Sequence, residues 1–127
     1  MENEGAYFIG STSDSAKERG WFFGSFIDEP LLRSSQVEVA WQHIPNVVPQ
    51  TKERHFHTES VEINIVVSGR VRIAIDETEY SLGAGEFYVI WPLTTVEMLS
   101  TDADAAVIVV RSPSVNDKHI VPIEQGK

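Results

Sequence analysis

The chain has 127 residues, a formal net charge of −9 and no cysteine. Its length fits one domain, and the lack of cysteine excludes disulfides, thiolate metal sites and cysteine nucleophiles. The basic residues are scattered rather than clustered, which argues against nucleic acids and anionic membranes as partners. The acidic N-terminus is unlike a signal peptide and no apolar run is long enough to span a bilayer, so we expect a cytoplasmic protein.

Residues 1–35 form an N-terminal extension with few regular patterns. Ser15 and Glu18 have capping-box spacing and Gly20 follows, so a helical turn near 14–19 is one interpretation and a polar loop is the other. The stretch GWFFGSFI over 20–27 is typical of a strand in which Gly24 marks a bulge or a close approach.

The rest of the chain alternates between apolar β-branched runs and turns. The Ser68-Gly69-Arg70 stretch predicts a hairpin, and the tail after residue 112 is expected to contribute at most an edge strand. Short strands with turns every eight to twelve residues favour an all-β sandwich or barrel, and the absence of repeats or linkers predicts one domain over 1–127. Strands are expected in the segments 36–44, 61–68, 71–77, 86–91, 96–99 and 105–112.

His55 and His57 are separated by one residue, and Glu62 follows five residues later. Successive side chains of a strand point to opposite faces, so the two histidines share one face. A carboxylate from the next strand can converge on them, which gives a two-histidine, one-carboxylate set suited to Fe, Mn, Ni or Zn. The alternative interpretation is a polar sheet face without an ion.

The spacing His55-x-His57-x4-Glu62-x6-Gly69 resembles the first motif of the cupin superfamily, although Pro49 stands where that motif has its leading glycine. The resemblance covers about residues 37–111 and implies a small single-domain cupin: a double-stranded β-helix, or jelly-roll barrel, with a short N-terminal elaboration. It also implies that His55, His57 and Glu62 are metal ligands.

The second cupin motif is degenerate in this sequence. Gly85 and Pro92 resemble its start, but either Val96 or Glu97 stands at the position of the fourth ligand, which is normally a histidine. Apolar patterning favours Val96 pointing inward. If Glu97 points inward instead, it adds a second carboxylate or acts as a catalytic general base. Both alternatives stay open at this point.

Several other side chains have two interpretations each. Asn64 shares strand parity with Glu62 and faces either the pocket or solvent, while His43 and Trp41 share a face of their own strand. His119 is expected in solvent. Phe87, Tyr88 and Trp91 are expected either to take part in packing or to form a stacking platform for a ligand. Arg54 and Arg72 are candidates for holding an anionic group.

We predict a cupin-domain protein that binds a small molecule, with a divalent metal held by His55, His57 and Glu62. The alternative is a metal-dependent enzyme, such as a dioxygenase or a sugar isomerase or epimerase, and a purely structural module is a third interpretation. The resemblance also implies a homodimer. The aromatic residues of the extension suit either a dimer contact or a cap on the barrel: Trp21, Phe22, Phe23 and Phe26.

Overall fold

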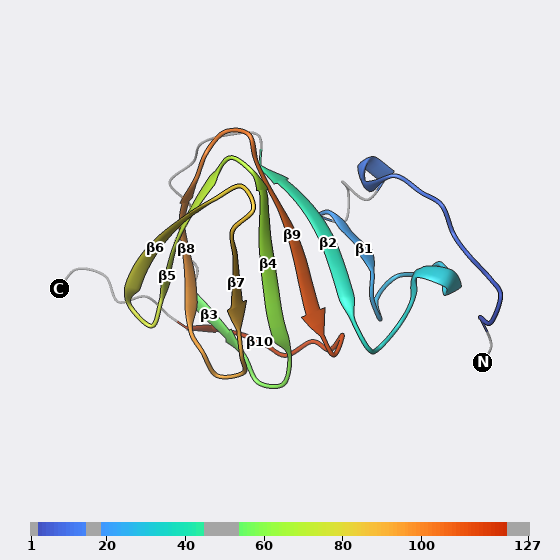
Figure 1. The fold of residues 1–127 in the computed structure, drawn as a ribbon. Helices are drawn as coiled ribbons and strands as arrows, with labels where there is room; N and C mark the ends of the chain where they lie inside the picture. Colours follow the sequence, from blue (N-terminus) through green and yellow to red (C-terminus); the bar gives the residue numbers. More distant parts are fainter. Residues whose placement is uncertain (1–2, 15–18, 45–53, 122–127) are drawn as a thin grey trace.

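The computed structural model describes residues 3–14, 19–44 and 54–121, and within them the chain forms two facing antiparallel sheets (Figure 1). The predicted all-β architecture is therefore confirmed. The expected helical turn near 14–19 falls mostly on residues 15–18, which lie outside the described part. None of the helical segments in the described residues is long and apolar enough to cross a membrane.

The first sheet has the strand order β1-β2-β9-β4-β7. All of its neighbouring strands pair antiparallel. In chain order its strands are β1 (Trp21–Phe23), β2 (Glu38–Ile44), β4 (Val61–Ser68), β7 (Phe87–Ile90) and β9 (Ala105–Ser112).

The second sheet has the strand order β10-β3-β8-β5-β6 and is also antiparallel throughout. The tail forms the edge strand β10 on β3, as predicted. In chain order its strands are β3 (Arg54–His57), β5 (Arg70–Ile75), β6 (Thr78–Gly83), β8 (Val96–Thr101) and β10 (Lys118–Val121). A short 3-10 helix, Pro30–Leu32, precedes β2.

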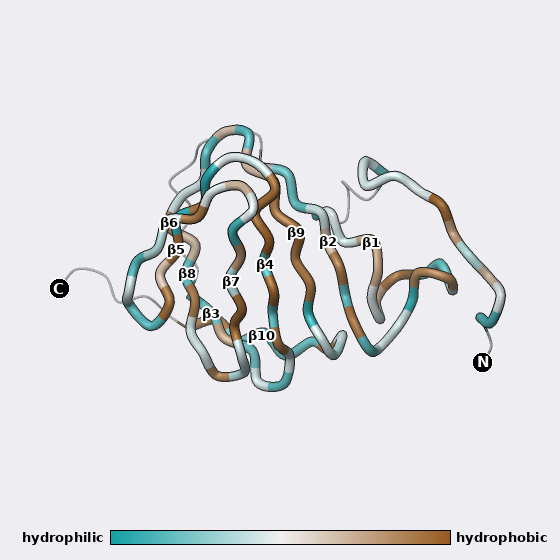
Figure 2. Tube along the Cα trace, viewed as in Figure 1, coloured by the Kyte–Doolittle hydropathy of each residue, from teal (hydrophilic) through white to brown (hydrophobic). Residues whose placement is uncertain are grey.

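The hydrophobic core lies between the two sheets. Along β4 the burial alternates strictly, with Glu62, Asn64 and Val66 inward, because a strand presents every second side chain to one face. Figure 2 shows β4 and β9 as hydrophobic over most of their lengths. The buried cluster comprises Ala40, Val66, Val71, Ile73, Leu82, Ala105, Val107 and Val109.

The predicted hairpin at Ser68-Gly69-Arg70 is wrong. β4 pairs with β7 and β9, whereas β5 pairs with β6 and β8, so Gly69 carries the chain from one sheet to the other. Gly69 has φ of +71°, and an added Cβ would lie 2.7 Å from the Cα of Ala105. The glycine is therefore required by a crossover turn under close packing rather than by a hairpin.

A two-residue hairpin does occur one turn later, between β5 and β6. Ile75 pairs with Thr78, and the intervening Asp76 and Glu77 have φ of +46° and +74°. Positive φ at both central positions is the signature of a type I′ turn, which usually contains Asn or Gly. The Asp76-Glu77 sequence therefore did not predict this hairpin turn.

The N-terminal extension adds β1 to the edge of the first sheet. Gly24, with φ of +153°, ends this strand, and an added Cβ there would lie 3.0 Å from the Cβ of Glu38. Trp21 packs against the core cluster, and the ring of Phe26 meets it edge-on at 5.7 Å. Trp21 thus extends the core at the edge of the first sheet.

Candidate functional site

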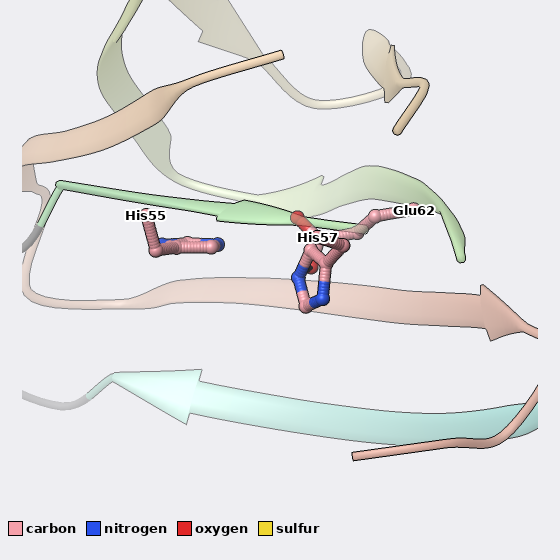
Figure 3. A group of neighbouring side chains, drawn as sticks. All are labelled: His55, His57 and Glu62. Atoms are coloured by element: carbon pink, nitrogen blue, oxygen red, sulfur yellow. Dashed lines mark ion pairs between the residues drawn. The ribbon is translucent and has the colours of Figure 1, made fainter. Parts of the chain in front are cut away.

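The two histidines of the HFH stretch lie on β3 and share one face, as strand alternation requires. Their rings are 5.3 Å apart and nearly perpendicular, at 85° (Figure 3). His57 is almost completely buried, with 2% of its surface exposed, whereas His55 is half-buried.

Glu62 reaches the histidines from the opposite sheet. It stands second on β4, points inward and lies 3.4 Å from His57, measured from Oε1 to Nε2. One ligand atom from each of His55, His57 and Glu62 can be chosen so that all three lie within 4.8 Å of one another. The structure thus brings together the three residues that the sequence motif singled out.

Asp117, which sequence reasoning missed, orients His57. The residue directly precedes β10, and its Oδ1 lies 3.0 Å from His57 Nδ1. The backbone N–H groups of Glu59 and Ser60 donate to Oδ2 at 2.7 and 2.8 Å, and the Ser60 hydroxyl also donates to the carboxylate. An ionised carboxylate only accepts hydrogen bonds, so His57 carries its proton on Nδ1 and turns Nε2 toward Glu62.

Arg111, also missed from the sequence, holds Glu62 from the neighbouring strand β9. Its Nε donates to Glu62 Oε1 at 2.7 Å, and its Nη1 donates to Glu38 Oε2 at 3.3 Å. Asn64 donates to the other Glu62 oxygen at 2.9 Å, which answers the open question about its direction. The guanidinium also lies 4.9 Å from the ring centre of Trp21. Glu62 is thus held by two donors of fixed geometry.

The electrostatics of the two histidines differ. Burial lowers the pKa of His55 to about 4, so this imidazole is neutral near pH 7. Burial also acts to lower the pKa of His57, but the carboxylates of Glu62 and Asp117 beside its two ring nitrogens outweigh it and leave the pKa raised. His55 is therefore the neutral imidazole of the pair near pH 7, whereas His57 more readily keeps a second proton.

Both carboxylates of the site are stabilised in their ionised form. Burial acts to raise the pKa of Glu62, but His57, Arg111 and Asn64 together hold it far below its usual range. Burial likewise opposes ionisation of Asp117, yet the backbone N–H groups of Ser60 and Glu59 and the His57 contact lower its pKa to about 2. Negative charge is therefore built into this end of the barrel.

Glu97, predicted as a catalytic base if it pointed inward, lies on the opposite face of its sheet from the histidines. Val96 pairs with His55 and Ile75 and so shares the inner face, whereas Glu97 pairs with Arg54 and Ala74. Glu97 Oε1 lies 3.6 Å from Arg54 Nη2, and both residues line an outer cavity of about 540 Å³. The apolar alternation had favoured Val96 as the inward residue, and the structure agrees. Neighbouring residues of a strand point to opposite faces, so Glu97 points outward when Val96 points inward.

Three other candidates, His43, His119 and Arg72, lie at the surface of the protein. His43 is exposed, near the end of β2, and His119 is exposed and stacks on Phe56 with ring centres 5.2 Å apart. Arg72 lies 3.3 Å from Asp102 on the protein surface. The contacts of His119 and Arg72 need no ligand, and neither residue adds to the site.

Replacing Asp117 by asparagine is expected to cost about 2 kcal/mol of unfolding free energy at pH 7. The pKa of Asp117 falls from 3.8 to about 2 on folding, so its stabilisation is present above pH 4 and disappears as the pH falls toward 2. Urea unfolding of both proteins between pH 7 and the lowest pH at which they stay folded tests this. If the difference in unfolding free energy between the two proteins stays constant down to pH 3, the assigned role of Asp117 is wrong.

The comparisons with known proteins agree with this architecture. A family model described as a cupin domain matches residues 46–110, which are 65 of the 127 residues. No curated protein matches the chain. Several solved structures are similar to this chain, and three of them are described next.

A Klebsiella pneumoniae protein with a double-stranded β-helix domain is 14% identical, with a TM-score of 0.63 over 92% of this chain and 99% of that chain. The nucleoside dehydratase Pac13 of Streptomyces is 17% identical, with a TM-score of 0.59 over 69% and 70% of the two chains. A sugar phosphate isomerase of Silicibacter pomeroyi is 25% identical, with a TM-score of 0.51 over 61% and 51%. The predicted double-stranded β-helix is confirmed.

Proposed function

This chain belongs to the cupin domain family, and we propose that it binds a small polar molecule in its barrel through a divalent metal ion held by His55, His57 and Glu62. The observation that carries the proposal is the convergence of three ligand atoms within 4.8 Å between the two sheets. Two imidazoles and one carboxylate suit Fe, Mn, Ni or Zn and leave positions open for a ligand.

The donor atoms fit a cation. His57 Nε2 is buried without a hydrogen-bond partner among the described residues and faces Glu62. A buried polar nitrogen without a partner is costly, and a metal ion bound to it would remove that cost. Asp117 on the other ring nitrogen is the outer partner that metal-binding histidines usually have.

The charge balance also supports a divalent ion. Glu38, Glu62 and Asp117 contribute three negative charges and Arg111 one positive, which leaves a net charge of −2 when both imidazoles are neutral. Arg111 donates a hydrogen bond to Oε1 of Glu62 and partly neutralises the negative charge of that carboxylate. We therefore expect binding weaker than at a site whose carboxylate has no cationic neighbour. When bound, the ion would supply Lewis-acid polarisation of a ligand oxygen.

A second candidate function is proton transfer by the same residues without a metal, and the position of His57 favours it. This imidazole stands between two carboxylates that raise its pKa, so it is suited to hold and release a proton in a buried site. A nucleoside dehydratase and a sugar phosphate isomerase are among the similar structures. Because both substrate classes are hydroxylated rings or chains, we propose a hydroxylated small molecule as the ligand in either case.

Calorimetric titration of tag-free, chelator-stripped protein with Zn(II), Mn(II), Ni(II) and Fe(II) tests the first candidate. One ion per chain is expected for at least one of these metals, and the Glu62→Gln variant is expected to bind it more weakly. If no ion binds, the metal proposal is wrong. NMR titration of the His57 ring nitrogens then tests the second candidate, which requires a pKa above 6.5.

A further inference from the structure

The cavity beside Glu97 lies on the outer face of the second sheet, on the other side of that sheet from the histidines. It is built on one row of paired residues that crosses the whole sheet: Val121 on β10, Arg54 on β3, Glu97 on β8, Ala74 on β5 and Glu79 on β6. Paired residues of neighbouring strands share a face, so this row points outward as Glu97 does. The cavity has a volume of about 540 Å³, within the usual range for small-molecule sites.

Ala74 forms the floor of the cavity. Its small side chain stands between two longer ones, Glu97 on β8 and Glu79 on β6. Neighbouring strands are about 4.8 Å apart, so the backbones that carry the two glutamates are separated by roughly 10 Å. Leu99 and Val121 also line the cavity and give it further apolar surface. A molecule in this cavity therefore meets apolar carbon between two carboxylates.

The side chains around the cavity are mostly acidic. Asp76, Glu77, Glu79 and Glu97 line it together with a single cation, Arg54, which gives a formal net charge of −3. Asp76 and Glu77 form the exposed turn between β5 and β6. Charge of one sign around a hollow surface raises the local concentration of ions of the opposite sign. The cavity is therefore suited to a cation.

Glu97 is buried in this cavity and lacks a hydrogen-bond donor. The residue is only 8% exposed, although it belongs to the outer face of the sheet. Its Oε1 is buried and has no hydrogen-bond partner among the described residues. Arg54 Nη2 lies 3.6 Å from this oxygen, which is too long for a hydrogen bond. A buried carboxylate oxygen without a donor is costly, so a bound molecule that donates to it would remove that cost.

The spacing of these carboxylates favours an organic cation over a metal ion. In the part of the chain that the structure describes, only His55, His57 and Glu62 bring three ligand atoms close enough together for a metal. An alkylammonium group instead carries three N–H donors on an apolar stem. A chain with an ammonium group at each end can reach two separate carboxylates and place its methylene groups on the apolar surface between them.

We propose that this cavity binds a linear diamine or polyamine. One ammonium group donates to Glu97 and a second one to Glu79, while the methylene chain lies along Ala74 and Leu99. The proposal is independent of the metal site. That site lies between the two sheets, whereas Glu97 and Glu79 point away from the first sheet.

Calorimetric titration of the full chain with 1,4-diaminobutane and with spermidine tests the proposal. One equivalent per chain is expected to bind, with an affinity that falls as the salt concentration rises. Glu97→Gln and Glu79→Gln each remove one charged acceptor and are expected to weaken binding by about 10-fold or more. n-Butylamine reaches only one of the two carboxylates and is expected to bind about 10-fold or more weakly than the diamine.

The matched control is Glu29→Gln, the same substitution at an exposed residue outside the cavity whose side chain makes no capping hydrogen bond. It is expected to bind the diamine as the wild type does. Glu79→Gln keeps the test decisive if Glu97→Gln does not fold, because Glu79 is exposed.

Four results would each overturn the proposal. Neither amine binds, or both cavity variants that fold bind the diamine as the wild type does. Glu29→Gln weakens binding as much as Glu79→Gln, which would indicate diffuse attraction to the acidic chain. Mg²⁺ at equal concentration displaces the diamine, which would make a metal ion the preferred occupant.

Discussion

Replacing Arg111 by methionine is expected to lower the free energy of unfolding by about 3 kcal/mol or more. The side chain of Arg111 is 19% exposed and holds two carboxylates, Glu62 and Glu38, whose side chains are 4% and 9% exposed. Removing the guanidinium leaves two buried carboxylates without the cation that both of them contact. Methionine keeps most of the side-chain volume, so the loss measures charge rather than a cavity. Urea unfolding at pH 7 gives the value directly.

The control for this prediction removes the whole charged cluster. The triple variant Arg111→Met/Glu38→Gln/Glu62→Gln no longer buries uncompensated charge and is expected to recover most of the lost stability. Ser114 and Asn64 can still hydrogen-bond to the new amides. A triple variant as unstable as Arg111→Met alone would show that Arg111 acts through packing against Trp21 instead.

Replacing His57 by alanine is expected to have the largest effect on metal binding. Outer partners of metal-binding histidines typically contribute 10–100-fold to affinity, so loss of the histidine itself should weaken binding by more than about 100-fold. Asp117→Asn is expected to weaken binding within that smaller range. Glu97→Gln is expected to leave binding unchanged, because Glu97 lies on the outer face. Calorimetric titration of the three variants with the same ion measures this order.

His119→Ala is the matched control for His57→Ala. It removes a histidine of the same protein from the exposed surface, where its ring stacks on Phe56. The His119 variant should bind metal as the wild type does, which separates loss of a ligand from a general change in histidine content. Equal weakening in both variants would contradict the assignment of His57 as a ligand.

Local patterns predicted the strands well, but not how they pair. Period-two alternation placed β4, β5 and β9 within a few residues, and the HFH spacing correctly put both histidines on one face. The Ser68-Gly69-Arg70 turn was misread as a hairpin because a glycine with positive φ serves a crossover between sheets equally well. Strand partners are set by contacts far apart in the sequence, which a local pattern does not contain.

The site was predicted only as far as its local motif extends. His55, His57 and Glu62 lie within eight residues of one another, whereas Arg111 lies on β9 and Asp117 directly before β10, far along the chain. Arg111 lies near the end of an apolar strand, where an arginine is usually a surface charge. In the fold it points inward and donates hydrogen bonds to Glu62 and Glu38. Asp117 sits in the tail, where no motif marks it.

Elemental analysis of protein purified without an affinity tag tests the metal site itself. We expect about one equivalent of a transition metal per chain, either as purified or after incubation with Fe(II), Mn(II), Ni(II) or Zn(II) followed by desalting. A folded His57→Ala variant is expected to lose this metal. Wild-type protein that remains metal-free after every one of these additions would contradict the claim that His55, His57 and Glu62 form a metal site.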